Sequence, residues 1–139
     1  MPAPAAELQE AIFASLSSDT ALVAAMGGAR ICDLAPANVA FPYIAFGCTS
    51  VYDWSTGTES GTEQLFTLHI WSKTKGKKET LDIMELARAR LADASLPLDG
   101  RRLVSLRLEF AEARHDDDLS LHHGLLRFRA VTQEARSKE

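Results

Sequence analysis

The chain has 139 residues, of which 46% are hydrophobic and 24% are charged, and its formal net charge is −4. This length fits one domain that buries its core without a disulfide or a metal. The acidic balance argues against nucleic-acid binding over the surface as a whole, because phosphate binding needs a basic face. The sequence has no apolar run of the ~20 residues that cross a membrane and no signal-peptide pattern, so we expect no membrane partner.

The first third of the chain predicts two helices and a short strand. Apolar residues recur at helical spacing over residues 5–17. A second helix is expected over residues 20–26, with Ser18 and Asp19 as a cap-like start and a glycine pair at its end. A brief strand follows at residues 29–33, and a loop with two prolines covers residues 35–42.

Two extended segments form the middle of the chain. Residues 43–54 are rich in aromatic and β-branched side chains, and residues 63–72 alternate with period 2. One face of the second segment carries Phe66, Leu68 and Ile70, and the other carries Thr67, His69 and Trp71. The Gly, Ser and Thr residues of 55–62 predict a mobile hairpin loop. Because it lies between other extended or helical segments, 63–72 is expected in the middle of a sheet.

The last third predicts a long helix over residues 77–94 and two strands, 102–114 and 122–133, joined by a charged turn. The expected inward residues are Val104, Leu106, Leu108, Phe110, Leu126, Phe128 and Ala130. The expected outward residues are Ser105, Arg107, Glu109, Arg127 and Arg129. Strands this long often extend beyond their own core, so part of each is expected to touch another subunit. Residues 134–139 are expected to fray.

The order of these elements predicts an α+β fold. We expect a largely antiparallel β-sheet of about four to five strands, with one long helix and the N-terminal helices packed on one face. Residues 1–139 are expected to form a single domain.

One hairpin gathers side chains that could bind a metal: His115, Asp116, Asp117, Asp118, His122 and His123. Neighbouring residues on a strand point to opposite faces, so His122 and His123 cannot both point inward. An acidic turn with surface imidazoles is the favoured interpretation. No catalytic motif is present either, so we assign no catalytic, cofactor-binding or metal residue and predict that the chain is not an enzyme.

Several side chains are candidates for an assembly interface instead. The outward Arg127 and Arg129 face Arg107 and Glu109, which fits either cross-strand salt bridges or a subunit contact. Amphipathic aromatic side chains close cores and also anchor interfaces. The full set of interface candidates is Trp54, Ser55, Thr56, Gly57, Thr58, Glu59, His69, Trp71, Arg107, Arg127 and Arg129.

The chain as a whole resembles the phage and gene-transfer-agent family of tail completion, or tail terminator, proteins. The resemblance rests on ordered segments over nearly the whole chain: LQEAIFASLSSDTALVAAMGG, FPYIAFG, DWSTGTESGTE, HIWSK, RLVSLRLEFAEARHDDD and HHGLLRFRAVTQ. Each segment is moderately specific, but their order and spacing together are more so.

The resemblance implies a structural particle protein that assembles in the cytoplasm and becomes part of the tail or neck. It implies a ring, usually hexameric, that caps the tail tube, stops its polymerisation and joins the tail to the head. The expected partners are further copies of the chain, the tail tube protein and head–tail connector proteins. DNA would pass through the bore without specific binding. A neck adaptor bound to the portal and a small metal-dependent enzyme are the alternatives.

Overall fold

The computed structural model describes residues 4–28, 30–33, 40–53, 61–73, 77–92, 96, 98, 101–118 and 120–134. Three helices and five strands are assigned in these residues. In chain order they are α1 (Pro4–Ser17), α2 (Thr20–Met26), β1 (Ile31–Cys32), β2 (Tyr43–Asp53), β3 (Gly61–Ser72), α3 (Lys78–Ala92), β4 (Arg101–Asp116) and β5 (Leu121–Glu134).

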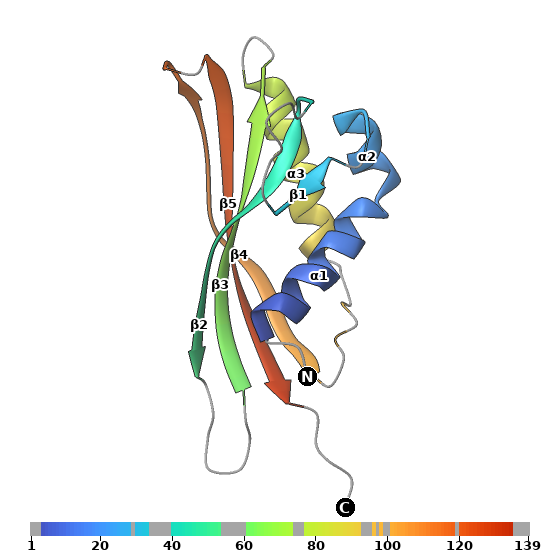
Figure 1. The fold of residues 1–139 in the computed structure, drawn as a ribbon, viewed down its shortest axis with the longest axis vertical. Coiled ribbons are helices and arrows are strands. Elements are labelled where there is room, and N and C mark those ends of the chain that lie inside the picture. Colours follow the sequence, from blue (N-terminus) through green and yellow to red (C-terminus); the bar gives the residue numbers. More distant parts are fainter. Residues whose placement is uncertain are drawn as a thin grey trace, which may run out of the picture.

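The strands form one sheet in the order β1-β2-β3-β5-β4. β1 runs parallel to β2, and the other neighbouring pairs are antiparallel. β3 is the middle strand, as its position between other extended or helical segments predicted. All three helices lie against one face of the sheet, and none of the described elements covers the opposite face (Figure 1). The α+β fold predicted from the sequence is therefore confirmed.

The core lies between the helices and the covered face of the sheet. The rings of Phe66 on β3 and Phe128 on β5 stack there, with centroids 5.3 Å apart. α3 packs directly on β5 at Gly124, where a Cβ atom would lie 2.7 Å from Met84 Sδ and 2.8 Å from Thr80 Cγ2. This glycine lets the helix approach the strand closely enough to exclude solvent from the core.

The ends of α2 follow the sequence signals. Asp19 accepts a hydrogen bond of 3.1 Å from the backbone N–H of Leu22, which satisfies one of the unpaired donors of the first turn. Gly27 then adopts φ = 76°, a left-handed conformation that favours glycine and ends the helix. None of the helices in the described residues is long and apolar enough to span a membrane.

β4 departs from the predicted pattern at two points. Its pairing with β5 shifts in register between Leu103 and Ser105 and again between Leu108 and Phe110. Each irregularity shifts the alternation of side chains by one position. Val104 and Phe110 are consequently 45% and 44% exposed, and the prediction that they point inward is wrong. Leu106 and Leu108 do pack against the core.

Several boundaries also differ from the prediction. Gly61 and Thr62 belong to β3, where they pair with β2 or β5, and not to the predicted loop. β4 and β5 are longer than expected, with 16 and 14 residues, and Glu134 is the last residue of β5. The predicted loop residues 55–60, the end of the predicted helix at 93–94 and the tail from 135 onwards lie outside the described residues.

Candidate assembly surface

The face of the sheet opposite the helices, which we call the open face, holds the described interface candidates. The register places His69 and Trp71 of β3 on this face. It places Arg107 of β4 and Arg127 and Arg129 of β5 on the same face. Five residues that are scattered in the sequence therefore share one surface. The other candidates, Trp54, Ser55, Thr56, Gly57, Thr58 and Glu59, lie outside the described residues.

Three aromatic rings stack at one end of the open face. The indole of Trp71 lies parallel to the imidazole of His123, with centroids 4.0 Å apart and 3° between the planes. The imidazole of His69 also stacks on that of His123, with their centroids 4.9 Å apart. His69 Nδ1 and His123 Nε2 are 2.7 Å apart and share a hydrogen bond. The stack therefore joins β3 to β5 through side chains as well as through the backbone.

A glycine on β2 makes room for this stack. The pairing of β2 with β3 is irregular between Phe46 and Thr49, and Gly47 lies in that interval. A Cβ atom at Gly47 would lie 2.3 Å from both His69 Nε2 and Thr67 Oγ1. The backbone of β2 thus passes directly against the side chains of β3, a close approach that only glycine permits.

The environment of the two imidazoles favours their neutral forms. Burial lowers the pKa of His69 from its ordinary value of 6.5. Burial is also the largest cause that lowers the pKa of His123, followed by the charges of His69 and Arg114. The carboxylates of Asp116 and Glu112 act in the opposite direction on the His123 pKa but do not cancel the effect. Loss of water from the charged form is the dominant physical reason.

The other end of the open face is rich in arginine. Arg129 donates a hydrogen bond of 2.6 Å from Nε to Glu63 Oε2 on β3, and Arg129 Nη2 forms an ion pair with the same oxygen. Glu109 falls at the second irregularity of β4, so the carboxylate that pairs with Arg129 is Glu63 of β3 and not Glu109. Arg107 lies directly opposite Arg129, so like charges face each other there.

Arg127 has a different neighbour. Its guanidinium carbon lies 5.5 Å from the ring centroid of Phe110, a cation–π distance. Phe110 reaches the open face because of the irregularity in β4, and sequence alternation alone did not place it there. Tyr52 on β2 is 53% exposed and shares this face, because it pairs with Glu63. Glu63, Phe110, Tyr52 and His123 also belong to this surface, and the sequence did not indicate them as interface candidates.

The histidine–aspartate hairpin is divided between the two faces of the sheet. His115 and His122 form a cross-strand pair, and His123 points to the opposite face. His115 Nδ1 is 2.7 Å from Asp117 Oδ1. Within the described residues, no group of three or more His, Cys, Asp or Glu side chains is arranged to hold a metal ion.

The chemistry of the open face is that of a binding surface. Exposed aromatic rings and arginines, with few lysines, are the side chains that protein–protein interfaces favour. The family comparison points the same way: the model of the family described as tail completion protein gp17 matches residues 10–133. The chain belongs to the tail completion protein family. It is thus a structural protein of tailed-phage or gene-transfer-agent particles, as the sequence resemblance predicted, and this family is not one of enzymes.

Two solved structures resemble this tail completion protein. One is a chain from a structure described as the virion of a native gene transfer agent particle. That chain is 28% identical with a TM-score of 0.86, over 96% of the present chain and 99% of the other. The other is the gp17 protein of bacteriophage SPP1, which is 21% identical with a TM-score of 0.62, over 96% and 92% of the two chains. The second likeness shows the fold alone. No match was found among curated protein sequences.

Proposed function

We propose that this tail completion protein is a tail terminator, which forms a ring on the end of the tail tube. The ring stops polymerisation of the tube protein and provides the surface that joins the tail to the head. Its subunits assemble in the cytoplasm, and six of them form the ring. DNA passes through the bore without sequence-specific contacts, in keeping with the net charge of −4.

The open face is the observation that carries this proposal. None of the described helices covers this face of the five-stranded sheet, and the face carries partly exposed aromatic rings and arginines. A surface of this kind is normally covered by another protein in the assembled state. The gene-transfer-agent chain of the same fold is itself part of a virion, which supports a particle context for this surface.

The ring is tested by native mass spectrometry and electron microscopy of the purified protein over a range of concentrations. Arg107→Glu and Arg127→Glu reverse charges on the open face and leave both Glu63 and Arg129 in place, although residue 107 is the cross-strand neighbour of Arg129. Both variants should fold normally and lose the ring at protein concentrations where the wild type keeps it. Lys77→Glu is the matched control, since Lys77 is exposed beside α3 on the opposite side of the sheet. A strictly monomeric wild type contradicts the proposal.

Tube capping requires a separate assay. Purified tube protein is polymerised with and without the tail completion protein, and tube lengths are measured by electron microscopy. A terminator shortens the tubes and is seen at one end of each. A neck adaptor bound to the portal would leave tube length unchanged and bind the connector proteins instead.

The residues between β2 and β3 are the second part of the proposal. We assign contact with the tube or with connector proteins to residues 54–59, which include Trp54 and Glu59. Deletion within residues 55–60 should leave Gly61 and Thr62 in place, because these residues form the start of β3. The variant is expected to keep the stability of the wild type and to lose tail attachment. An equal loss of stability and of tail attachment contradicts the assignment.

A further inference from the structure

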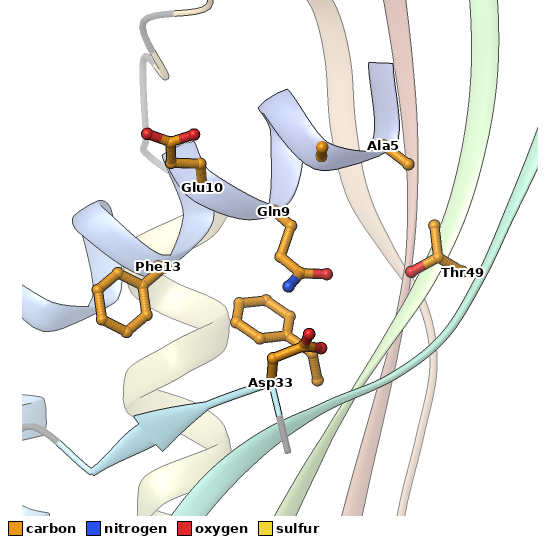
Figure 2. Close-up of a pocket in the computed structure, with 8 residues that line it drawn as sticks. Ala5, Gln9, Glu10, Phe13, Asp33 and Thr49 are labelled. Atoms are coloured by element: carbon orange, nitrogen blue, oxygen red, sulfur yellow. The ribbon is translucent and has the colours of Figure 1, made fainter. Parts of the chain in front are cut away.

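A groove runs between α1 and β2 on the side of the molecule opposite the open face. Its volume is about 590 Å³, and it is open to solvent. The main lining side chains are Gln9, Glu10, Phe13, Asp33, Phe46 and Thr49. Figure 2 shows that Gln9, Asp33 and Thr49 turn their polar ends toward the same space, whereas the Glu10 carboxylate points away from it at the rim. The groove is larger than one side chain, so it has room for a segment of another polypeptide.

A smaller cavity lies beneath this groove. Its volume is about 10 Å³, and it shares Ala5, Gln9, Phe46 and Thr49 with the groove above. Its remaining walls come from buried residues of α1 and β3: Leu8, Ile12, Gln64 and Phe66. A cavity of this size holds roughly one water molecule or the tip of one polar side chain.

Gln64 at the wall of this cavity has an unsatisfied oxygen. The residue is 0% exposed, and its Nε2 is 3.5 Å from Thr132 Oγ1. Its Oε1 has no hydrogen-bond partner within the described part of the chain. A buried acceptor without a donor is costly, and a well-packed protein would normally carry an apolar residue there. A hydrogen-bond donor that enters this cavity from another molecule would satisfy the Gln64 oxygen and would account for a glutamine at this buried position.

The groove and cavity together select one kind of donor. Asp33 supplies a carboxylate, and Gln9, Thr49 and Gln64 supply further oxygen acceptors along the path inward. The rings of Phe13 and Phe46 offer flat apolar walls. A guanidinium group has five N–H donors and a permanent positive charge, and it stacks on aromatic rings. An arginine therefore fits this combination better than a lysine or a neutral donor.

Among the residues whose side chains the structure describes, the exposed arginines lie elsewhere, on the open face. Arg107 is exposed on β4 and has only the like charge of Arg129 in the cross-strand position. The acidic groove and the basic open face lie on opposite sides of the same subunit, so neither can satisfy the other internally. Two different complementary patches on one chain are what a head-to-tail ring requires.

The geometry points to the α1–β2 groove as the receptor for an arginine of the neighbouring copy of this chain, with Arg107 as the inserted residue. Its guanidinium reaches between Phe13 and Phe46, pairs with Asp33 and donates toward Gln64. This inference rests on the proposed ring and names the two patches that build it. The α1–β2 groove of each subunit thus contacts the open face of the next.

The test combines three variants, each measured by native mass spectrometry over a dilution series and by thermal unfolding. Asp33→Lys should raise the concentration at which the ring half-dissociates by roughly tenfold to a hundredfold, because it removes the partner of a charged hydrogen bond. Asp118→Lys is the matched control, with the same charge change on the exposed β4–β5 turn. The exchange variant, Asp33→Arg with Arg107→Asp, should restore assembly toward the wild-type level.

Gln64→Leu separates a binding role from a structural role. Replacing the unsatisfied amide with a side chain of similar size should keep or raise the unfolding temperature of the subunit while it weakens the ring. If the cavity holds only a water molecule, Gln64→Leu leaves assembly unchanged, and the inference is overturned. If the wild type forms a ring and neither Asp33→Lys nor Gln64→Leu weakens it, this inference is overturned and the proposed function is not. Absence of a ring in the wild type overturns the proposed function as well.

Discussion

The indole of Trp71 and the imidazole of His123 lie face to face on neighbouring strands, with 4.0 Å between their centroids. This contact, extended by His69, joins the two central strands on a face that no helix covers. It places stacked aromatic rings at one end of the open face, whereas Arg107 and Arg129 lie toward the other end. A surface of that kind is suited to binding another protein in one fixed orientation.

The histidine pair should make stability depend on pH. Both pKa values are lower in the folded protein than the ordinary value of 6.5, so the unfolded chain binds more protons in this range. The free energy of unfolding should be highest above about pH 6.5 and should fall as the pH drops through 6.5 toward the folded-state values.

The measurement is thermal unfolding between about pH 8 and about pH 5, with NMR titration of the imidazole signals. The double variant with His69→Gln and His123→Gln should show a shallower loss of stability with acid. An unchanged slope in that variant would mean that other groups control the acid response.

Gly47→Ala should destabilise the fold by about 1–3 kcal/mol, because the added methyl group forces side chains and backbone apart. The added Cβ would lie 2.3 Å from His69 Nε2 and from Thr67 Oγ1. Chemical denaturation measures the loss. Ser50→Ala, on the same strand, is the control and should change stability by less than about 0.5 kcal/mol. Equal stability of Gly47→Ala and the wild type would show that β2 can move away at no cost.

Phe110 and Phe128 should respond very differently to truncation. Phe128 is 1% exposed and stacks on Phe66, so Phe128→Ala should cost about 3–5 kcal/mol. Phe110 is 44% exposed, so Phe110→Ala should cost less than about 1 kcal/mol. Urea denaturation of the two variants checks the difference. Similar losses of unfolding free energy in the two variants would show that Phe110 is buried, as the simple alternation predicted.

The Glu63–Arg129 pair should contribute modestly and in a salt-dependent way. Glu63→Gln leaves Arg129 beside Arg107 without its carboxylate partner, and the free energy of unfolding should fall by roughly 1 kcal/mol. A double-mutant cycle with Arg129→Gln, at low and high salt, measures the coupling. A coupling of zero at low salt would show that the pair only positions the two side chains.

The sequence by itself determined the elements and the faces that ordinary alternation controls. Helical spacing, the Asp19 cap and the Gly27 stop placed α2, and period-2 alternation placed Phe66, Leu68 and Ile70 in the core. These features are local, because each depends on residues within a few positions of one another. The order of the recognisable segments along the chain also indicated the tail completion protein family, and the match to the model of that family confirms it.

Only the tertiary structure decided which side chains meet. The second irregularity in β4 moved Phe110 to the open face, and the neighbouring strand gave Arg129 its partner in Glu63 in place of Glu109. The stack of His69, His123 and Trp71 joins residues more than 50 positions apart. The sequence shows Gln64 only as a polar strand residue, but α1 covers it, its side chain lines a small cavity, and its Oε1 has no hydrogen-bond partner within the described residues. Register and helix packing arise from contacts between distant segments, and one residue of slip reverses the face on which a side chain lies.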